Sequence, residues 1–128
     1  PERNLQPSLD VMLAAVSAST KAVFISNPNN PTGAMITEAE MSRFRAALPP
    51  EVLLVIDSAY AEYISRSDYN AGERLVDATD NTIMTRTFSK VFGLGGIRLG
   101  WCYGPPGILH VLNRIRCAFY LSVAAPAA

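Results

Sequence analysis

Residues that could bind a phosphate and act as a nucleophile gather between positions 85 and 98. Thr85-Arg86-Thr87-Phe88-Ser89-Lys90 is followed closely by Gly93-Leu94-Gly95-Gly96-Ile97-Arg98. A lone lysine is usually a solvated surface group, but this one follows a predicted strand and lies among hydroxyls. The dinucleotide fingerprint needs a third glycine where Arg98 stands, and the chain has no Gly-Lys-Ser/Thr sequence of a P-loop. The hydroxyls and the forked donors of an arginine remain suited to a phosphate group.

A second group of candidate residues is the segment Asn27-Pro28-Asn29-Asn30-Pro31-Thr32-Gly33. Asn, Pro and Gly are the usual turn residues, so a plain turn explains this composition. The two X-Pro bonds among asparagines equally suit a rigid loop that presents a side-chain amide to a ligand. The residue types alone leave both interpretations open.

A third candidate group, Asp57-Ser58-Ala59-Tyr60, directly follows the apolar run from Val52 to Ile56. An aspartate at the end of a strand can cap the helix that follows it. The same carboxylate could instead lie in a low-dielectric crevice and pair with a cationic ligand group, which would favour its ionised form. These two roles also remain open.

Short apolar, β-prone runs bounded by turn residues predict the strands that must position these groups. The predicted strands lie near residues 22–26, 52–57, 82–87 and 97–103. We expect the first three to be parallel. The connection after Lys90 is shorter than the crossover of about a dozen residues that a parallel neighbour requires, so the fourth strand should run antiparallel.

Apolar residues at helical spacing predict helices between these strands. Ser8 precedes the first such pattern, and Thr37 with Glu40 forms a capping-box pattern before the second. A weaker helix is expected between residues 69 and 78, and a last one begins near Pro106 and presents a face that runs to Phe119. Strands separated by helices indicate an α/β layered sheet, in which ligands bind beyond the carboxyl ends of the strands.

Composition excludes several classes of protein. The 128 residues are 49% hydrophobic, which suits one domain with a sizeable core. Charged residues make up 17%, with eleven basic and eleven acidic, so a disordered tail or a nucleic-acid-binding surface is not expected. One histidine and two distant cysteines cannot form the usual four-ligand zinc site, and we expect no metal. The apolar runs are too short to span a membrane, and the two cysteines favour a reducing, cytoplasmic location.

The three groups together resemble the pyridoxal-phosphate-dependent aminotransferases of fold type I. The resemblance rests on Asn30-Pro31-Thr32-Gly33, on Asp57 with Tyr60, and on Ser89-Lys90 with Arg98 eight positions after the lysine. Within this family, segments 27–33, 57–63 and 86–94 are most similar to the histidinol-phosphate aminotransferases. The three motifs in this order are highly specific, so they favour ligand-binding roles over the turn and the cap. The resemblance implies a three-layer α/β/α fold with a mostly parallel sheet, and a cis peptide bond before Pro31.

The resemblance also implies roles around the reactive part of the cofactor. Lys90 forms the Schiff base with the cofactor aldehyde and then moves a proton between the substrate and the cofactor. Asp57 pairs with the pyridine nitrogen and keeps it protonated, so that the ring can accept electrons. Asn30 and Tyr60 donate hydrogen bonds to the phenolic oxygen of the ring.

The remaining roles concern the ring face and the phosphate. The resemblance implies that Ala59 lies against one face of the ring. It further implies that Thr87, Ser89 and Arg98 hold the phosphate dianion. Strand alternation predicts that Arg86 points away from Thr87, and we expect it to be structural. All the cofactor-binding residues should converge on one crevice.

The chain also lacks parts that the family has. The resemblance implies that residues 1–128 are the central part of the cofactor-binding large domain. The missing N-terminal part supplies a second phosphate-binding loop and an aromatic ring, and the missing C-terminal small domain supplies an arginine for the substrate carboxylate. Many relatives have Gly-Pro-Phe-Asn where this chain has Cys117-Ala118-Phe119-Tyr120. We therefore expect weak cofactor binding and no detectable transamination by the piece alone.

The leading functional interpretation is amino transfer from histidinol phosphate to 2-oxoglutarate in histidine biosynthesis. One alternative is another enzyme of the same fold type, such as an aromatic aminotransferase or a threonine-phosphate decarboxylase. Another is a catalytically inactive interaction fragment. The partners would be an amino donor and a 2-oxo acid, with neither nucleic acid nor a membrane. Unpaired strand edges and exposed helix faces predict association, most simply as a homodimer.

Overall fold

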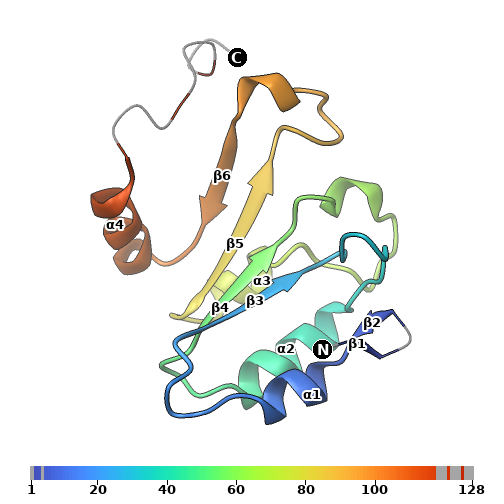
Figure 1. Cartoon of the computed structure of the whole chain (residues 1–128), viewed down its shortest axis with the longest axis vertical. Helices are drawn as coiled ribbons and strands as arrows, with labels where there is room; N and C mark the ends of the chain where they lie inside the picture. The colour runs from blue at the N-terminus through green and yellow to red at the C-terminus, as the bar shows by residue number, and fades with distance from the viewer. Residues whose placement is uncertain (1, 4, 118–120, 122–124, 126–128) are drawn as a thin grey trace.

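The computed structural model describes residues 2–3, 5–117, 121 and 125, and its centre is a four-stranded sheet in the order β3-β4-β5-β6 (Figure 1). The strands of this sheet are β3 (Ala22–Ser26), β4 (Leu53–Asp57), β5 (Thr82–Thr87) and β6 (Gly100–Tyr103). A small antiparallel pair, β1 (Glu2–Arg3) and β2 (Gln6–Pro7), precedes it. No sequence pattern predicted that pair.

The strand directions agree with the prediction. Strands β3, β4 and β5 are parallel, and their register aligns Ile25 with Ile56 and Ile56 with Met84. Strand β6 is antiparallel to β5. It begins at Gly100 rather than near residue 97, so the predicted start was wrong. The 3-10 helix η2 (Gly95–Ile97) and the left-handed backbone of Arg98 (φ 58°) interrupt the extended conformation there.

In the described part of the chain, four α-helices connect or follow the strands. They are α1 (Leu9–Ala14), α2 (Glu38–Ala47), α3 (Glu73–Asp77) and α4 (Pro106–Ile115), and a 3-10 turn, η1 (Ala61–Tyr63), follows β4. Ser8 occupies the N-cap position of α1 without a side-chain hydrogen bond. The predicted face of the last helix ran to Phe119, which lies outside the described residues. Among the described residues, no helix is long and apolar enough to cross a membrane.

The capping box at α2 is confirmed. The backbone N–H of Glu40 donates to Thr37 Oγ1 at 3.3 Å, and the backbone N–H of Thr37 donates to Glu40 Oε2 at 2.9 Å. The Thr37 hydroxyl also donates to Glu40 Oε2, at 2.6 Å, and this bond, followed by the one from the Thr37 N–H, lowers the pKa of the Glu40 carboxyl. The start of α2 is therefore stabilised by two residues that are three positions apart in the sequence.

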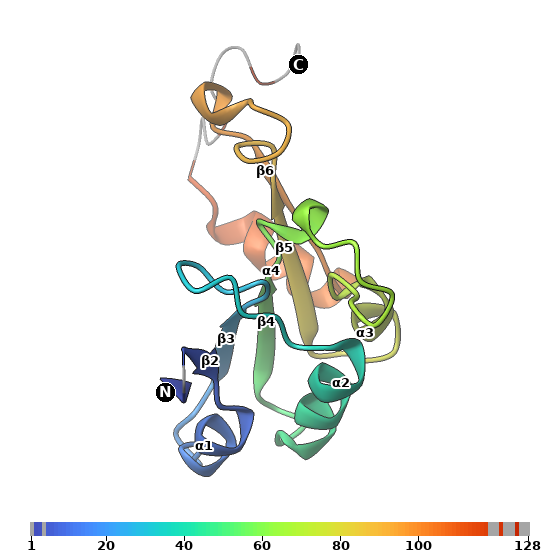
Figure 2. The same cartoon turned by 90° about the vertical axis from the view of Figure 1, so that its right-hand side faces the viewer.

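One side of the sheet carries the main core. Apolar side chains of β3, β4, α2 and the residues that flank α2 form this core, and they are Ile25, Ile36, Met41, Phe44, Leu48, Leu54 and Ile56. Apolar residues of α1 pack against the same cluster, and Val76 of α3 joins Met84 of β5 next to it. Figure 2 shows α2 and α3 on the same side of the sheet.

The opposite side of the sheet is covered unevenly. Helix α4 lies at the β6 end of the sheet, away from α1 and α2 (Figure 1). A Cβ atom on Gly104 would lie 2.5 Å from Ile83 Cγ2 and 3.6 Å from Leu109 Cδ2, so α4 packs closely there. At the other end, the Phe24 side chain on β3 is 72% exposed. The three helices α1 to α3 therefore cover one side, and α4 covers part of the other.

Candidate functional site

The three candidate groups begin side by side at the carboxyl ends of β3, β4 and β5. The parallel hydrogen-bond ladder continues past the strands, since the Asn27 N–H donates to the Asp57 carbonyl at 2.9 Å. The Ser58 N–H likewise donates to the Thr85 carbonyl at 3.0 Å. Three segments far apart in the sequence are thus joined at one edge of the sheet, as expected for parallel strands.

Asn27 fixes the first of these segments. Its side chain is buried, with Nδ2 donating to the Ile36 carbonyl and Oδ1 accepting from the Ile36 N–H, both at 2.9 Å. Tyr69 adds a hydrogen bond from its hydroxyl to the Asn27 carbonyl at 2.9 Å. Burial raises the pKa of Tyr69 to about 12, so this hydroxyl stays a donor at neutral pH. Both X-Pro bonds, Asn27-Pro28 and Asn30-Pro31, are cis; the second was predicted and the first was not.

Asn30, Tyr60 and Lys90 come together from three different segments. The amide Nδ2 of Asn30 donates to the Tyr60 hydroxyl at 3.2 Å. The ammonium Nζ of Lys90 lies over the Tyr60 ring, 5.0 Å from its centroid, which is within cation–π range. Asn30 and Lys90 are exposed, so both polar groups are accessible to a ligand.

Asp57, at the end of β4, accepts hydrogen bonds from two donors. The Ala59 N–H donates to Asp57 Oδ1 at 3.2 Å, and the Thr85 hydroxyl donates to the same oxygen at 3.4 Å. Both hydrogen bonds use Oδ1, and no hydrogen bond to the other carboxylate oxygen, Oδ2, is seen among the described residues. The side chain is exposed, so the expected low-dielectric crevice around this carboxylate was wrong for this chain.

Thr87, Ser89 and Arg98 form a second polar group after β5. The Ser89 N–H donates to Thr87 Oγ1 at 3.0 Å, and Arg98 Nη1 donates to Ser89 Oγ at 3.3 Å. Nη1 also donates to the Gly95 carbonyl at 2.7 Å, which orients the guanidinium. Two hydroxyls beside an exposed guanidinium form a suitable site for an anion with several oxygens.

The sequence analysis assigned no partner to Arg86. In the structure Arg86 Nη2 forms an ion pair with Glu62 Oε1, and its guanidinium carbon lies 5.6 Å from the Trp101 ring centroid. The Arg86 and Glu62 side chains are only 19% and 20% exposed. Strand alternation indicated the direction of Arg86, but no local signal connects residues this far apart in the chain.

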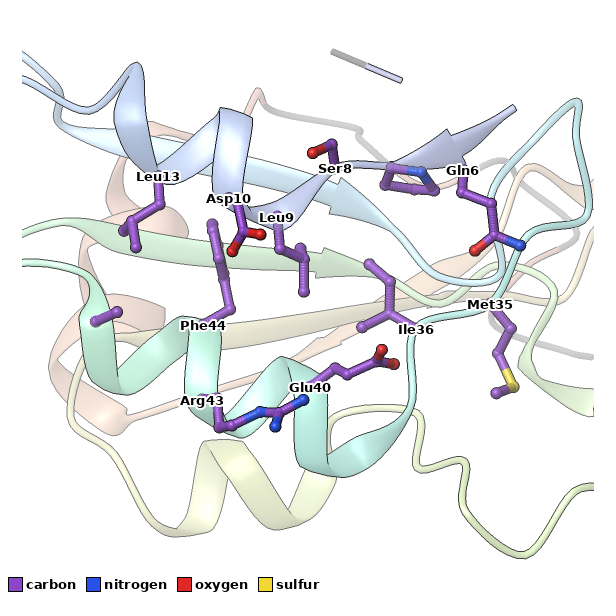
Figure 3. Close-up of a pocket in the computed structure, with 12 residues that line it drawn as sticks. Gln6, Ser8, Leu9, Asp10, Leu13, Met35, Ile36, Glu40, Arg43 and Phe44 are labelled. Atoms are coloured by element: carbon purple, nitrogen blue, oxygen red, sulfur yellow. The ribbon is translucent and has the colours of Figure 1, made fainter. Parts of the chain in front are cut away.

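A hollow on the surface lies away from these residues. It has a volume of about 710 Å³ and lies between α1 and α2 (Figure 3). Leu9, Leu13 and Phe44 line it together with the charged residues Asp10 and Arg43. A smaller hollow of about 270 Å³ adjoins Asn30 and Tyr60 and is lined by prolines and by Tyr63. Among the described residues, no group of acidic, histidine or cysteine side chains could hold a metal ion.

Comparison with known proteins identifies the family. Residues 1–128 match the family described as aminotransferase class I and II. The chain belongs to this family. It is 58% identical over 124 residues to a histidinol-phosphate aminotransferase of Granulibacter bethesdensis and 56% identical over 128 residues to one of Rhodospirillum centenum. These alignments cover 97% and 100% of the chain but 34% and 35% of the relatives, so the chain spans about a third of their length.

Solved structures of this aminotransferase family have the same fold. The crystal structure of histidinol-phosphate aminotransferase from Sinorhizobium meliloti in complex with pyridoxal-5'-phosphate superposes with a TM-score of 0.89 at 36% identity. The match covers 99% of this chain and 34% of that one. An L-threonine-O-3-phosphate decarboxylase from Porphyromonas gingivalis has a TM-score of 0.74 at 18% identity, which shows the shared fold alone. The predicted α/β class with a mostly parallel sheet is therefore confirmed.

Proposed function

We propose that this chain is the central part of the cofactor-binding large domain of a histidinol-phosphate aminotransferase. The proposed reaction transfers the amino group of histidinol phosphate to 2-oxoglutarate. The observation that carries the proposal is the Lys90 ammonium over the Tyr60 ring, whose hydroxyl is bonded to Asn30. The curated relatives at 52–58% identity support this substrate over those of a decarboxylase.

The described residues fit pyridoxal phosphate as the cofactor. A guanidinium has five N–H donors, and the two hydrogen bonds seen between Arg98 and other described residues both use Nη1, which leaves further donors that could face a phosphate. Thr87 and Ser89 provide hydroxyls beside it. The Oδ2 atom of Asp57 is available to accept from a protonated ring nitrogen. Ala59 leaves room for a flat ring because its side chain is a single methyl group.

Each residue then has a task in the proposed mechanism. When bound, the cofactor supplies an electron sink for the charge that develops at the substrate α carbon. Lys90 holds the cofactor through Nζ and moves the proton at that carbon. Asp57 holds the proton on the ring nitrogen. Tyr60 and Asn30 orient the ring through its phenolic oxygen, and the hydroxyl and guanidinium groups after β5 anchor the phosphate.

Assembly and location belong to the same proposal. We infer a homodimer in the cytoplasm. The edges of β3 and β6 that have no strand partner among the described residues, and the exposed apolar side chains Phe24 and Ile115, support association. The free cysteines Cys102 and Cys117 support a reducing compartment.

Covalent capture of the cofactor tests the assignment of Lys90. The chain is incubated with pyridoxal phosphate, reduced with borohydride, digested, and analysed by mass spectrometry. The chain contains two lysines, Lys21 and Lys90, so Lys21→Ala is a matched control. We expect the label on Lys90, unchanged labelling in Lys21→Ala, and none in Lys90→Ala. Equal labelling of both lysines would contradict the site.

A chimera tests the substrate. This chain replaces the matching 124 residues of the Granulibacter bethesdensis enzyme, to which it is 58% identical. We expect the chimera to transaminate histidinol phosphate and to lose that activity with Lys90→Ala. The chain alone should show no turnover. A folded, cofactor-loaded chimera that fails with histidinol phosphate would contradict the proposed function.

A further inference from the structure

The ion pair between Glu62 and Arg86 involves a residue two positions after Tyr60 in the chain. Glu62 belongs to η1, the single 3-10 turn that starts immediately after Tyr60. Arg86 belongs to β5, the strand that leads to Lys90. The ion pair therefore connects the segment that carries the Tyr60 ring with the strand that leads to the ammonium above this ring.

Arg86 is held in a fixed place on the sheet. It pairs with Trp101 of β6 in the antiparallel register, and its guanidinium lies over the Trp101 ring. A planar guanidinium stacked in this way keeps one orientation better than an ammonium would. Arg86 thus provides a rigid point to which a neighbouring segment can be attached.

Glu62 is the acidic partner that neutralises Arg86 in the described part of the chain. The Arg86 side chain is 19% exposed, and its buried Nε has no hydrogen-bond partner among the described residues. A pair taken this far from water adds little net stability, but loss of one partner leaves an uncompensated charge. Such a pair restricts the position of η1 more than it increases the stability of the fold.

The turn after Tyr60 is short. It consists of residues 61–63, and a lone 3-10 turn is not stable in isolation. Within it, the Tyr63 N–H donates to the Tyr60 carbonyl at 3.1 Å, and the two tyrosine ring centroids lie 6.1 Å apart. Ala61, which is 7% exposed, packs near Met84 of β5 through an apolar methyl group. The carboxylate of Glu62 adds a charged, directional attachment to Arg86 of the same strand.

We propose that Glu62 and Arg86 are positioning residues for Tyr60. The ion pair fixes η1 against β5, and so holds the Tyr60 ring beneath Lys90 and its hydroxyl within reach of Asn30. This inference deepens the proposed function, because Tyr60 would orient the cofactor there. The geometry on which it rests exists in the chain without any ligand.

The first test therefore uses the cofactor-free chain. The nuclear Overhauser cross-peak between the Tyr60 ring protons and the Lys90 Cε protons reports their contact. We expect Glu62→Gln, which removes the charge at constant shape, to lose this cross-peak. Asp68→Asn breaks the exposed pair Arg66–Asp68, whose side chains are 64% and 45% exposed, and should keep it. An unchanged cross-peak in a folded Glu62→Gln chain would overturn the proposal.

A conservative variant guards against misfolding. If Glu62→Gln loses the amide shifts of the folded sheet, the same comparison is made with Glu62→Asp. This variant keeps the charge but shortens the side chain by one methylene. We expect Glu62→Asp to weaken the cross-peak while the sheet shifts remain. An unchanged cross-peak in Glu62→Asp would then overturn the proposal.

The second test uses pyridoxal phosphate and a double-mutant cycle. We expect Glu62→Gln to weaken cofactor affinity about tenfold in the wild-type background, which corresponds to roughly one charge-assisted hydrogen bond. In a Tyr60→Phe background the same change should have less than about a twofold effect, because the hydroxyl that it positions is gone. Equal effects in both backgrounds would indicate a structural role only and overturn the proposal. If none of the four variants in the cycle binds pyridoxal phosphate, the result counts against the proposed function. The cross-peak measured in the cofactor-free chain still decides the positioning role of Glu62 and Arg86.

Discussion

The two sides of the sheet differ most clearly at neighbouring residues of β3. Ile25 is 3% exposed in the main core, whereas Phe24, one position earlier, is 72% exposed. Because strand side chains alternate, Asp57 points to the opposite side from Ile56, and its hydrogen bond to Thr85 lies on that second side. The chain therefore places its main core on one side of the sheet and part of its candidate chemistry on the other, where Val55 and Ile83 are buried but Phe24 is exposed.

The largest expected effect is a difference in unfolding free energy between substitutions on the two sides of the sheet. Ile56→Ala should lower the free energy of unfolding by about 3 kcal/mol, because Ile56 is 1% exposed and its loss leaves a cavity. Phe24→Ala should change it by less than about 0.5 kcal/mol, as is usual for surface substitutions. Urea unfolding followed by circular dichroism measures both. Similar losses in the two variants would contradict the comparison.

The next expected effect concerns self-association of the chain through the side of the sheet on which Phe24 is exposed. Phe24→Ser removes an aromatic ring whose burial in a contact contributes about 1.5–3 kcal/mol. We therefore expect self-association of the chain to weaken by about tenfold or more. Sedimentation velocity over a range of concentrations measures this change. Lys21→Ser, an exposed change just before the same strand, should leave the association constant unaltered.

A smaller effect on stability concerns the N-cap of α2, the helix that packs on the main core. Thr37→Ala should cost about 1 kcal/mol, the usual contribution of an N-cap side chain. Glu40 has a lowered pKa in the folded chain, so its contribution is present above its ordinary pKa of 4.5 and is lost as pH falls through the folded value. The stability difference between the wild type and Glu40→Gln should therefore shrink in acid. Urea unfolding at neutral and acidic pH measures it, and a difference that is constant with pH would exclude this origin.

The smallest expected effect concerns the two thiols. Cys102 on β6 is half-buried, and burial raises the pKa of its thiol, whereas Cys117 is exposed. Iodoacetamide should therefore alkylate Cys117 first, because the thiolate is the reactive form. Mass spectrometry of partly labelled chain measures the order. Faster labelling of Cys102 would contradict the half-buried position of its thiol.

Local sequence patterns predicted much of the fold. The strands and the capping box at Thr37 depend on residues close in the chain, which a pattern can detect. The pair of β1 and β2 contains two residues in each strand, too few to show any alternation. The predicted start of the fourth strand was wrong because the left-handed backbone at Arg98 is unusual for a residue with a side chain.

For the candidate site too, local motifs predicted some features, whereas others depend on tertiary contacts. Its residue types were recognisable as motifs, and the structure places Asn30, Tyr60 and Lys90 in contact. The roles of these residues toward a cofactor remain predictions. The contact between Glu62 and Arg86 could not be predicted from spacing, since it depends on how a turn after one strand packs on the next strand. The exposure of Asp57 also depends on tertiary surroundings that no local pattern describes.

The left-handed backbone of Arg98 has a consequence for protein engineering. A side chain in this conformation costs about 1–2 kcal/mol, and glycine avoids that cost. A screen that selects variants only for heat resistance should therefore favour glycine at position 98. Every chain recovered in this way would lack the guanidinium beside Ser89. Thermostability selection on this scaffold consequently needs a simultaneous selection for anion binding.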